Sequence, residues 1–242
     1  MDITKYTRPA RKALNLKLRR CGAVIVAAGS ASRMEGVDKI MANLGGEPVI
    51  KRTVRAFQEN DVISEIVVVT REDLLIPISN LCAGFDKVTA VVVGGKTRVE
   101  SVHLGLNAMS DKVKLAAIHD GARPLVSWQV IDRVVRAGNA FHAAAPGIPV
   151  KDTVKTIHGG IVKDTPDRST LRAVQTPQVF DYDLIRGALK QAIIEEAPIT
   201  DDCSAVERLG MTVKIVEGDE RNIKITTPLD LKIAELMLEE PV

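Results

Sequence analysis

Short aliphatic runs alternate with amphipathic stretches from residue 22 onward, which predicts strands and helices in turn. The runs with strand character are Gly22 to Ala27, Glu65 to Thr70, Lys87 to Val93 and Leu115 to His119. Helical spacing of apolar residues is found at Asp73 to Ala83, Arg98 to Met109, Ser127 to Phe141 and Tyr182 to Glu196. Strands that return to one sheet through helices run parallel, with right-handed crossovers. The pattern predicts an α/β fold with a doubly wound, mostly parallel sheet.

Two further helices carry signals at their starts. Pro48 is expected at the first helical position, where a proline loses no hydrogen bond because that N–H has no helical partner. The last helix is introduced by Thr227, Pro228, Leu229 and Asp230, a cap followed by a permitted proline and an acidic residue at the third helical position.

Residues 150–172 break this alternation. Apolar and polar side chains alternate there around Gly159 and Gly160, which predicts a protruding β-hairpin. A lone two-stranded ribbon is marginally stable in water, so we expect this arm to pack against a second subunit. The chain is accordingly divided into an extension at 1–20 and a single domain at 21–242, which forms a homodimer through an arm at about 150–172.

Composition agrees with strands buried on both faces. The 242 residues are 45% hydrophobic but only 3% aromatic, as expected when small and β-branched side chains fill parallel strands covered by helices. This length suits one well-filled core. A parallel sheet gathers its ligands beyond the carboxyl ends of its strands, so we expect the chemistry just after each aliphatic run.

The net charge of +2 conceals a basic leader. The first twenty residues carry seven lysines and arginines against Asp2 alone, a balance of +6 that leaves −4 on the body. That body lacks the basic face that nucleic-acid binding requires. The leader has no apolar stretch for a secretory signal or a membrane span, so no membrane partner is expected. It is a solvated or loosely helical extension, a partner-binding arm or an organellar address.

The cysteines and histidines favour neither a disulfide framework nor a metal cage. Cys21, Cys82 and Cys203 lie far apart in the sequence, which fits a reducing compartment and a cytoplasmic protein. The four histidines are scattered, without the spacing of metal ligands. Packing or surface roles are expected for them.

The loop after the first strand is the first candidate for chemistry. Ala27, Ala28 and Gly29 open a run of small residues that leads to Arg33, and Lys39 follows six residues later. Small side chains let backbone N–H groups approach a polyphosphate, and the cations can neutralise the remaining charge. A flexible turn with solvated charges is the alternative.

Two other phosphate motifs fail against the sequence. A dinucleotide fingerprint begun at Gly29 would need glycine at Ala31 and Met34. The tripeptide Gly95-Lys96-Thr97 ends like a Walker A loop, but Ala90 stands where the motif needs its first glycine. A nicotinamide oxidoreductase and a P-loop NTPase are therefore both disfavoured.

The motifs taken together resemble those of sugar-phosphate nucleotidyltransferases, and most of all the 2-C-methyl-D-erythritol 4-phosphate cytidylyltransferase family. The resemblance covers nearly the whole chain after residue 21. It rests on Ala27-Ala28-Gly29 with Arg33-Met34 and Lys39, Gly94-Gly95 with Arg98 and Ser101, His119 to Pro124, Pro149 to Thr153, Asp167-Arg168, Gln175 to Gln178, Thr200 to Asp202, and Glu217-Gly218 with Asn222 to Thr226. The reaction implied is attack by a polyol phosphate on the α-phosphorus of CTP, with pyrophosphate leaving.

The resemblance also implies roles for particular residues. Arg33 and Lys39 would stabilise the transition state, and Arg168 and Lys224 would orient the incoming phosphate. Backbone groups near Ala27, Ala28, Gly29, Gly95 and Lys96, together with the Ser101 hydroxyl, would receive cytosine. Asp120, at the strand end before Gly121, would face ribose, the polyol or Mg²⁺, although without the resemblance it could cap the next helix. Arg123, Thr153 and Thr176 would hold the polyol phosphate, Thr153 within one chain or across a dimer interface.

Mg²⁺ is the expected cofactor, bound mostly through the CTP phosphates with few protein ligands, of which Asp120 is one. The chain departs from the family at Asp38, where many members have proline, and at Lys96, a position that is often acidic. A ribitol 5-phosphate cytidylyltransferase and a non-catalytic nucleotide sensor stay open as alternatives, and the preference for CTP over UTP rests on one or two hydrogen-bonding groups.

Overall fold

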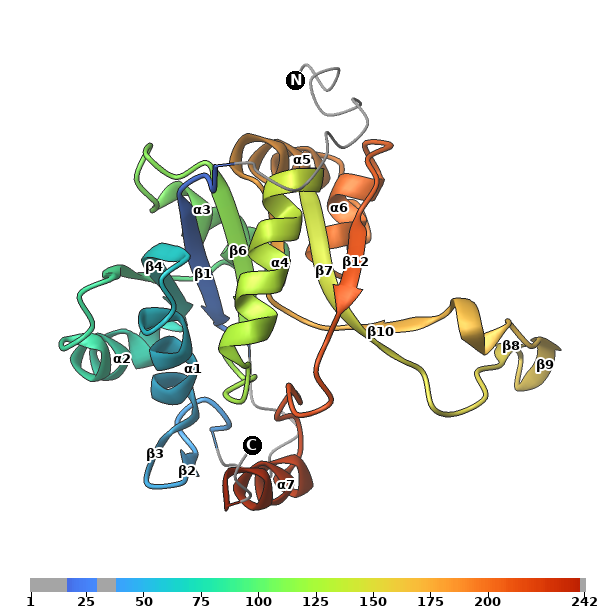
Figure 1. Ribbon diagram of the computed structural model, residues 1–242, viewed down its shortest axis with the longest axis horizontal. Coiled ribbons are helices and arrows are strands. Elements are labelled where there is room, and N and C mark those ends of the chain that lie inside the picture. Colours follow the sequence, from blue (N-terminus) through green and yellow to red (C-terminus); the bar gives the residue numbers. More distant parts are fainter. Residues whose placement is uncertain (1–16, 30–37, 240–242) are drawn as a thin grey trace.

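The computed structural model describes residues 17–29 and 38–239, and within them an eight-stranded sheet has the order β10-β7-β11-β6-β1-β4-β5, with β12 beside β7 (Figure 1). Four strands on one side are mutually parallel: β1 (Cys21–Ala27), β4 (Ile63–Thr70), β5 (Val88–Val93) and β6 (Leu115–Asp120). This confirms the predicted α/β class, and these are the four strands that the aliphatic runs predicted.

The other half of the sheet is mixed and was not predicted strand by strand. It contains β7 (Ala143–Pro149), β10 (Arg172–Val174), β11 (Gln178–Asp181) and β12 (Lys214–Glu217). β11 runs antiparallel to both β6 and β7, and β10 runs antiparallel to β7, whereas β12 is parallel to β7. β7 is rich in alanine and contains two prolines, and the other three strands are three or four residues long, so the β-propensity signal is weak.

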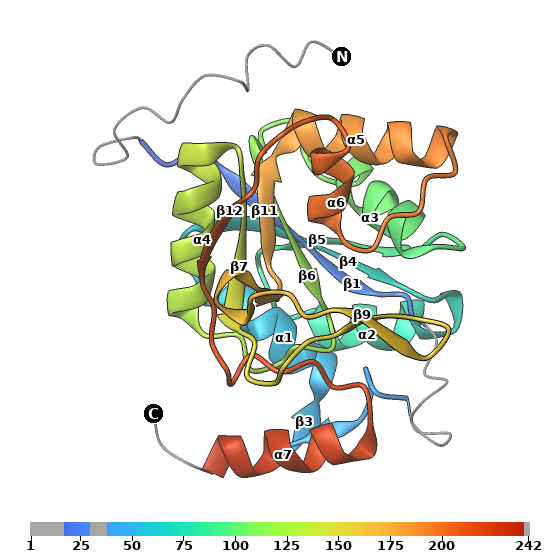
Figure 2. The ribbon, with the colours of Figure 1, turned by 90° about the vertical axis from the view of Figure 1, so that its right-hand side faces the viewer.

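Helices cover both faces of the sheet, as Figures 1 and 2 show. One face packs against α1 (Val49–Gln58), α2 (Leu75–Cys82) and α4 (Trp128–Phe141), and the other against α3 (Arg98–Asn107), α5 (Tyr182–Ile194) and α6 (Asp202–Glu207). The alternation of β1 explains the two cores. Ala23 and Ile25 point into the first core and Val24 into the second, and all three are fully buried.

The helices predicted from Arg98 and Tyr182 begin at those residues, and of the two predicted start signals the one before the last helix is confirmed and the one at Pro48 is not. Before α7 (Pro228–Glu239), the Thr227 hydroxyl accepts the Asp230 N–H at 3.3 Å, as a cap should, and the Asp230 carboxylate accepts the Thr227 N–H at 2.8 Å in return. Pro48 precedes α1 rather than opening it, because it stays extended in the short ribbon formed by β2 (Asn43–Leu44) and β3 (Glu47–Pro48). The helix predicted from Asp73 begins instead as a 3₁₀ turn at Glu72–Leu74.

Residues 156–164 form a hairpin that projects from the sheet in Figure 1. β8 (Thr156–His158) and β9 (Ile161–Asp164) pair antiparallel around Gly159 and Gly160, whose φ angles of 55° and 79° suit glycine in a tight turn. Ile157 and Ile161 on this arm are 66% and 74% exposed.

Arg19 and Arg20, at the end of the predicted extension, contact residues of the domain. The Arg19 guanidinium lies 2.6 Å from the Asp181 carboxylate and 2.9 Å from the Asn139 side-chain oxygen, and Arg20 donates to Ser64. Composition alone could not show these partners, because they lie more than forty residues away in the sequence. Residues 1–16 of the extension lie outside the described residues. Among the helices of the described ranges, none combines the length and apolar character of a membrane span.

Candidate active site

A pocket of about 390 Å³ lies where the four parallel strands end. The strand register brings these ends together, because Ala27 pairs with Thr70, Thr70 with Val93, and Val26 with Asp120. Nine of the predicted site residues line it: Ala27, Ala28, Gly29, Lys39, Gly95, Lys96, Ser101, Asp120 and Lys224. The pocket is thus found at the edge of the sheet where the topology placed it.

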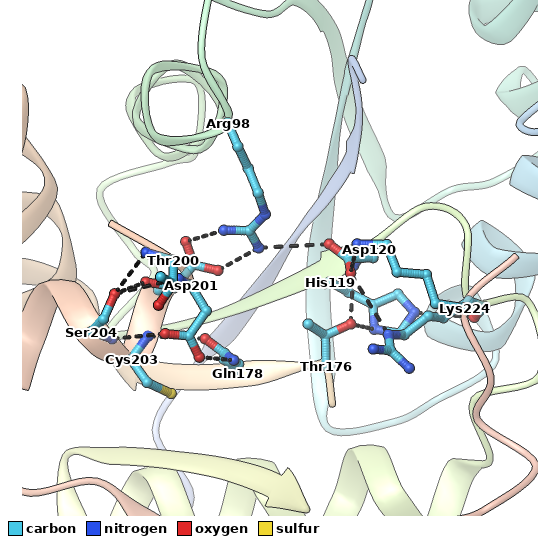
Figure 3. A network of polar contacts seen from close by, with 12 residues as sticks. Arg98, His119, Asp120, Thr176, Gln178, Thr200, Asp201, Cys203, Ser204 and Lys224 are labelled. Carbon is cyan, nitrogen blue, oxygen red and sulfur yellow. Dashed lines mark hydrogen bonds and ion pairs between the residues drawn. The ribbon is translucent and has the colours of Figure 1, made fainter. Parts of the chain in front are cut away.

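Asp120 lines this pocket at the end of β6, and Figure 3 shows the polar contacts around it. Its carboxylate lies 2.8 Å from the Lys224 ammonium and 3.6 Å from the guanidinium groups of both Arg98 and Arg123. Burial opposes ionisation, but the surrounding cations outweigh it, Lys224 most of all, and lower the pKa of Asp120 to about 2. Asp120 is therefore charged at neutral pH. It does not cap a helix, since α4 begins eight residues later at Trp128.

A buried chain of hydrogen bonds through Thr176 and His119 fixes the backbone of Asp120. The Asp120 N–H donates to the Thr176 hydroxyl at 3.1 Å, and that hydroxyl lies 3.0 Å from His119 Nδ1. His119 Nε2 lies 3.2 Å from the Arg123 carbonyl. Burial lowers the pKa of His119 to about 4, so the ring is neutral. A carbonyl only accepts, so Nε2 carries the proton and Nδ1 accepts from Thr176. The predicted contact of Thr176 with the polyol phosphate therefore competes with a structural role.

Arg98 links the pocket to a second network on its far side (Figure 3). Its guanidinium donates to both carboxylate oxygens of the fully buried Asp202, at 2.9 and 2.6 Å. Burial disfavours the charge on Arg98, but Asp202 outweighs that cost and raises the pKa of the guanidinium. Asp201 caps α6 and also accepts from the Gln178 side chain at 2.8 Å. One arginine thus connects α3, α6 and the end of β6.

The loop between β5 and α3 packs closely on the loop after β1. A Cβ on Gly94 would lie 2.6 Å from the Ala28 side chain, so only glycine fits there without movement. The Ser101 hydroxyl accepts from the Gly95 N–H at 3.1 Å and donates to the Thr97 carbonyl at 2.9 Å. Its proton is therefore committed to the loop, which leaves an acceptor lone pair for a ligand.

Several predicted residues do not line this pocket. Arg168 and Thr153 are exposed on the arm, where Arg168 donates to the Lys151 carbonyl at 2.5 Å. Arg123 donates to the Asn222 carbonyl at 2.6 Å and does not line the pocket, and Gly121 packs against Ile50. Lys224 lines the pocket of the chain, whereas Arg168 is not among the residues that line it. Arg33 lies outside the described residues.

The donor groups of the pocket fit Mg²⁺ only in part. Among residues 17–29 and 38–239, no three His, Cys, Asp or Glu side chains come together as a metal site. Asp120 supplies one ionised carboxylate, whose Oδ1 has only the longer contact with Arg98. One carboxylate together with substrate phosphates is a usual coordination for Mg²⁺. The pocket therefore suits an ion that arrives with a nucleotide.

Sequence reasoning did not select Arg71 and Arg98 as site residues, although both line the pocket. The rule that chemistry follows each aliphatic run would have found Arg71, since it comes directly after Thr70 at the end of β4. Arg98 was only one member of a matching motif. Its importance comes from Asp202, which lies 104 residues away.

Comparisons with known proteins agree with this geometry. Residues 21–240 match the family described as 2-C-methyl-D-erythritol 4-phosphate cytidylyltransferase. A relative of that name from Caldanaerobacter subterraneus is 44% identical over 223 residues, which cover 90% of this chain and 98% of the relative. One from Clostridium novyi is 43% identical over 90% of this chain and 96% of its own length.

A solved structure, 4-diphosphocytidyl-2C-methyl-D-erythritol synthase from Anaerococcus prevotii, has a TM-score of 0.84 and 31% identity over 92% of this chain and 97% of its own. The cytidylyltransferase of Thermus thermophilus has a TM-score of 0.75 and 32% identity over 90% of this chain and 98% of its own. The chain therefore belongs to the 2-C-methyl-D-erythritol 4-phosphate cytidylyltransferase family.

Proposed function

We propose that this chain joins CTP to 2-C-methyl-D-erythritol 4-phosphate in the pocket at the end of β1, forming 4-diphosphocytidyl-2-C-methyl-D-erythritol and pyrophosphate for non-mevalonate isoprenoid biosynthesis. The observation that carries the proposal is the meeting of Lys39 and Lys224 around a loop of small residues at the carboxyl ends of four parallel strands. Family membership favours this substrate over ribitol 5-phosphate and favours an enzyme over a sensor.

In the reaction, an oxygen of the polyol phosphate forms a bond to the α-phosphorus of CTP while the bond from that phosphorus to the bridging oxygen of pyrophosphate breaks. Both reactants are anions, and a phosphate oxygen needs no general base. Catalysis then consists of charge neutralisation and in-line positioning. The proposed mechanism therefore needs no Ser-His-Asp triad, because the phosphate oxygen is already a nucleophile.

Lys39 and Lys224 have different roles in the proposed reaction. Lys39 lines the pocket together with Ala28 and Gly29 at the end of β1. It neutralises the negative charge that develops on the α-phosphoryl group, with Arg33 as its proposed partner. Lys224 is held by Asp120 at 2.8 Å and orients the incoming phosphate. A cation placed against charge that appears only in the transition state raises turnover rather than affinity alone.

The nucleotide is proposed to bind with its base against the backbone of Ala28, Gly29 and Gly95. The lone pair of Ser101 that remains free of the loop hydrogen bonds faces the same pocket. Gly94 packs closely on Ala28, which limits the width of the proposed base site and supports a pyrimidine over a purine. Asp120 and the nucleotide phosphates would hold Mg²⁺, which would supply positive charge to the leaving pyrophosphate.

A homodimer is proposed to complete the site. Arg168 and Thr153 lie on the arm and line no part of the pocket of their own chain, so a partner pocket is where they could contact substrate. Exposed Ile157 and Ile161 give the arm an apolar surface for a second subunit. A cytoplasmic location is proposed as well, since all three cysteines are free and buried.

The test is pyrophosphate release by the full chain with each of the four nucleoside triphosphates and with both polyol phosphates, in the presence of Mg²⁺. Turnover is expected with CTP and 2-C-methyl-D-erythritol 4-phosphate. Turnover with ribitol 5-phosphate instead would change the substrate, and CTP binding without release of pyrophosphate from any pair would favour the sensor. Either result would overturn the proposal.

A further inference from the structure

Asp38 holds the turn that carries Lys39 through its carboxylate and through its backbone carbonyl. Its Oδ1 accepts the N–H of Ile40 at 2.9 Å, and the Asp38 carbonyl accepts the N–H of Met41 at 3.1 Å. Ile40 is buried, and its carbonyl accepts the N–H of Ile50 in α1 at 3.0 Å. The turn that carries Lys39 is therefore anchored to the first core on its far side.

Arg71 holds the same turn from the side of the sheet. Directly after β4, its guanidinium lies 2.5 Å from Asp38 Oδ2 and 3.4 Å from the Gly29 carbonyl. Asp73 accepts from Nε and Nη2 of the guanidinium in two bonds of 3.0 Å, and Nη2 is also the donor to Asp38. The Arg71 side chain is only 25% exposed, and its hydrogen bonds to Asp73 and Asp38 raise its pKa. One charged group thus joins the end of β1, the end of β4 and the Lys39 turn.

We propose that Arg71 is a positioning residue, and that its ion pair with Asp38 fixes Lys39 relative to the nucleotide loop at the end of β1. This inference rests on the proposed function, since it assigns Lys39 a catalytic role. A displacement of about 1 Å in a positioned group can reduce a rate by about a hundredfold. A planar guanidinium is suited to bridge several acceptors at once, which an ammonium group cannot do with the same geometry.

The hydrogen-bond donors of Arg71 are mostly bound to protein groups, which favours a positioning role over direct binding of a phosphate. Of the roughly five N–H donors of an arginine, four are engaged by Asp38, Asp73 and Gly29. Arg71 lines the pocket, but its hydrogen bonds are directed to protein groups. A residue used in this way should affect turnover more than nucleotide affinity.

The experiment is a double-variant cycle with Arg71→Gln and Asp38→Asn, measured as kcat and KM for CTP, with CTP affinity from calorimetry. Asp38→Asn keeps one oxygen for the Ile40 N–H but replaces the oxygen that accepts from Arg71 with an amide NH2 group, so it removes the ion pair. Arg71→Gln should lower kcat by about 10-fold to 100-fold, with KM and affinity changed less than about threefold. Asp38→Asn should lower kcat less than Arg71→Gln does, and the double variant should be no slower than Arg71→Gln.

The control variant is Glu72→Gln, at the exposed residue next to Arg71 in the sequence. It should leave kcat, KM and CTP affinity unchanged.

Multiplicative effects in the double variant would overturn the inference, and so would an Arg71→Gln variant that changes KM or CTP affinity but not kcat. The latter would make Arg71 a ligand of the nucleotide. If Arg71→Gln does not fold by circular dichroism, Arg71→Lys replaces it and should give an intermediate kcat. If the wild-type protein releases pyrophosphate but the double-variant cycle shows no coupling between Arg71 and Asp38, this inference fails and the proposed function stands. Inactive wild-type protein removes the proposed function with it.

Discussion

At the scale of single residues, the charge of Asp120 needs an explanation, because this acidic group lines a pocket proposed for two anions. Its three cationic neighbours supply one. Unpaired cations packed together would repel one another, and a central carboxylate lets Lys224, Arg98 and Arg123 converge. The carboxylate also fixes the Lys224 ammonium before a substrate arrives, which is the condition for preorganised electrostatic stabilisation.

Lys39 should be the most sensitive single residue in the site. We expect Lys39→Ala to lower kcat by about a hundredfold or more, as for the loss of one preorganised donor to a transition state. Steady-state pyrophosphate release measures the effect. Lys112→Ala, which removes an exposed lysine away from the pocket, is the matched control. Wild-type turnover in Lys39→Ala would show that the catalytic assignment is wrong.

His119 should make stability depend on pH. Its pKa is lowered from 6.5 to about 4 in the folded chain, because burial disfavours the charged ring. The unfolded chain therefore binds the extra proton between these values, and stability is lost as pH falls from about 6.5 towards 4. The loss is on the order of 3 kcal/mol, at 1.36 kcal/mol per pKa unit.

Urea unfolding at a series of pH values between 7 and 4 measures this loss. A His119→Gln variant should be less stable at pH 7, since its side chain cannot replace both ring hydrogen bonds, yet its stability should fall less over the same range. Equal pH dependence in the two proteins would assign the effect to other groups. Asp120 cannot account for it, because its pKa shift acts only below about pH 4.

At the scale of elements, the start of α3 connects helix stability to the pocket. The Thr97 hydroxyl accepts the Glu100 N–H, and the Glu100 carboxylate accepts the Thr97 N–H, which together form a capping box. The carbonyl of Thr97 also receives the Ser101 hydroxyl. The helix cap and the glycine loop at 94–95 are thus one structure.

Thr97→Ala should lower the free energy of unfolding by about 1 kcal/mol, as expected for loss of an N-cap hydroxyl. It should also raise KM for CTP, because the Gly95 loop loses a support. Denaturant titration and steady-state kinetics provide the two measurements, and Thr97→Ser, which keeps the hydroxyl, is the control. If Thr97→Ala matches Thr97→Ser in both, the cap contributes neither stability nor loop geometry.

At the scale of the whole molecule, the arm raises the question of how many chains make one site. Lys39 lines the pocket while Arg168 lies on the projecting arm. If a partner supplies Arg168, a mixture of inactive Lys39→Ala and Arg168→Ala chains should regain about one quarter of wild-type activity, because half of the dimers are mixed and each has one intact site.

Pyrophosphate release after the two variants are mixed and allowed to exchange subunits tests this prediction. Each variant alone serves as the control, and sedimentation should show dimers. A mixture that stays as inactive as its components, despite exchange, would place Arg168 and Lys39 in the site of the same chain. Ile157→Asp with Ile161→Asp should give monomers with little activity, since both apolar side chains are exposed on the single chain. A fully active monomer would contradict the shared site.

Much of the fold and part of the site could be predicted from the sequence. The strands β1, β4, β5 and β6, the small-residue loop, Lys39 and Asp120 all follow from patterns within a few residues of each other. Strand periodicity and strand ends are local properties, and the edge at which they meet follows from parallel topology. The short strands β10 and β12 carried too few residues for such a pattern.

The sequence by itself determined the class of sheet, the position of the pocket and the presence of Lys39 beside it, because these depend on short-range order and connectivity. Only the tertiary structure decided which charges pair. Arg98 with Asp202, Arg71 with Asp38 and Arg19 with Asp181 are separated by 104, 33 and 162 residues. An ion pair depends on distance in space, and no local pattern encodes which of many acidic residues folding will bring within 3 Å of a given arginine.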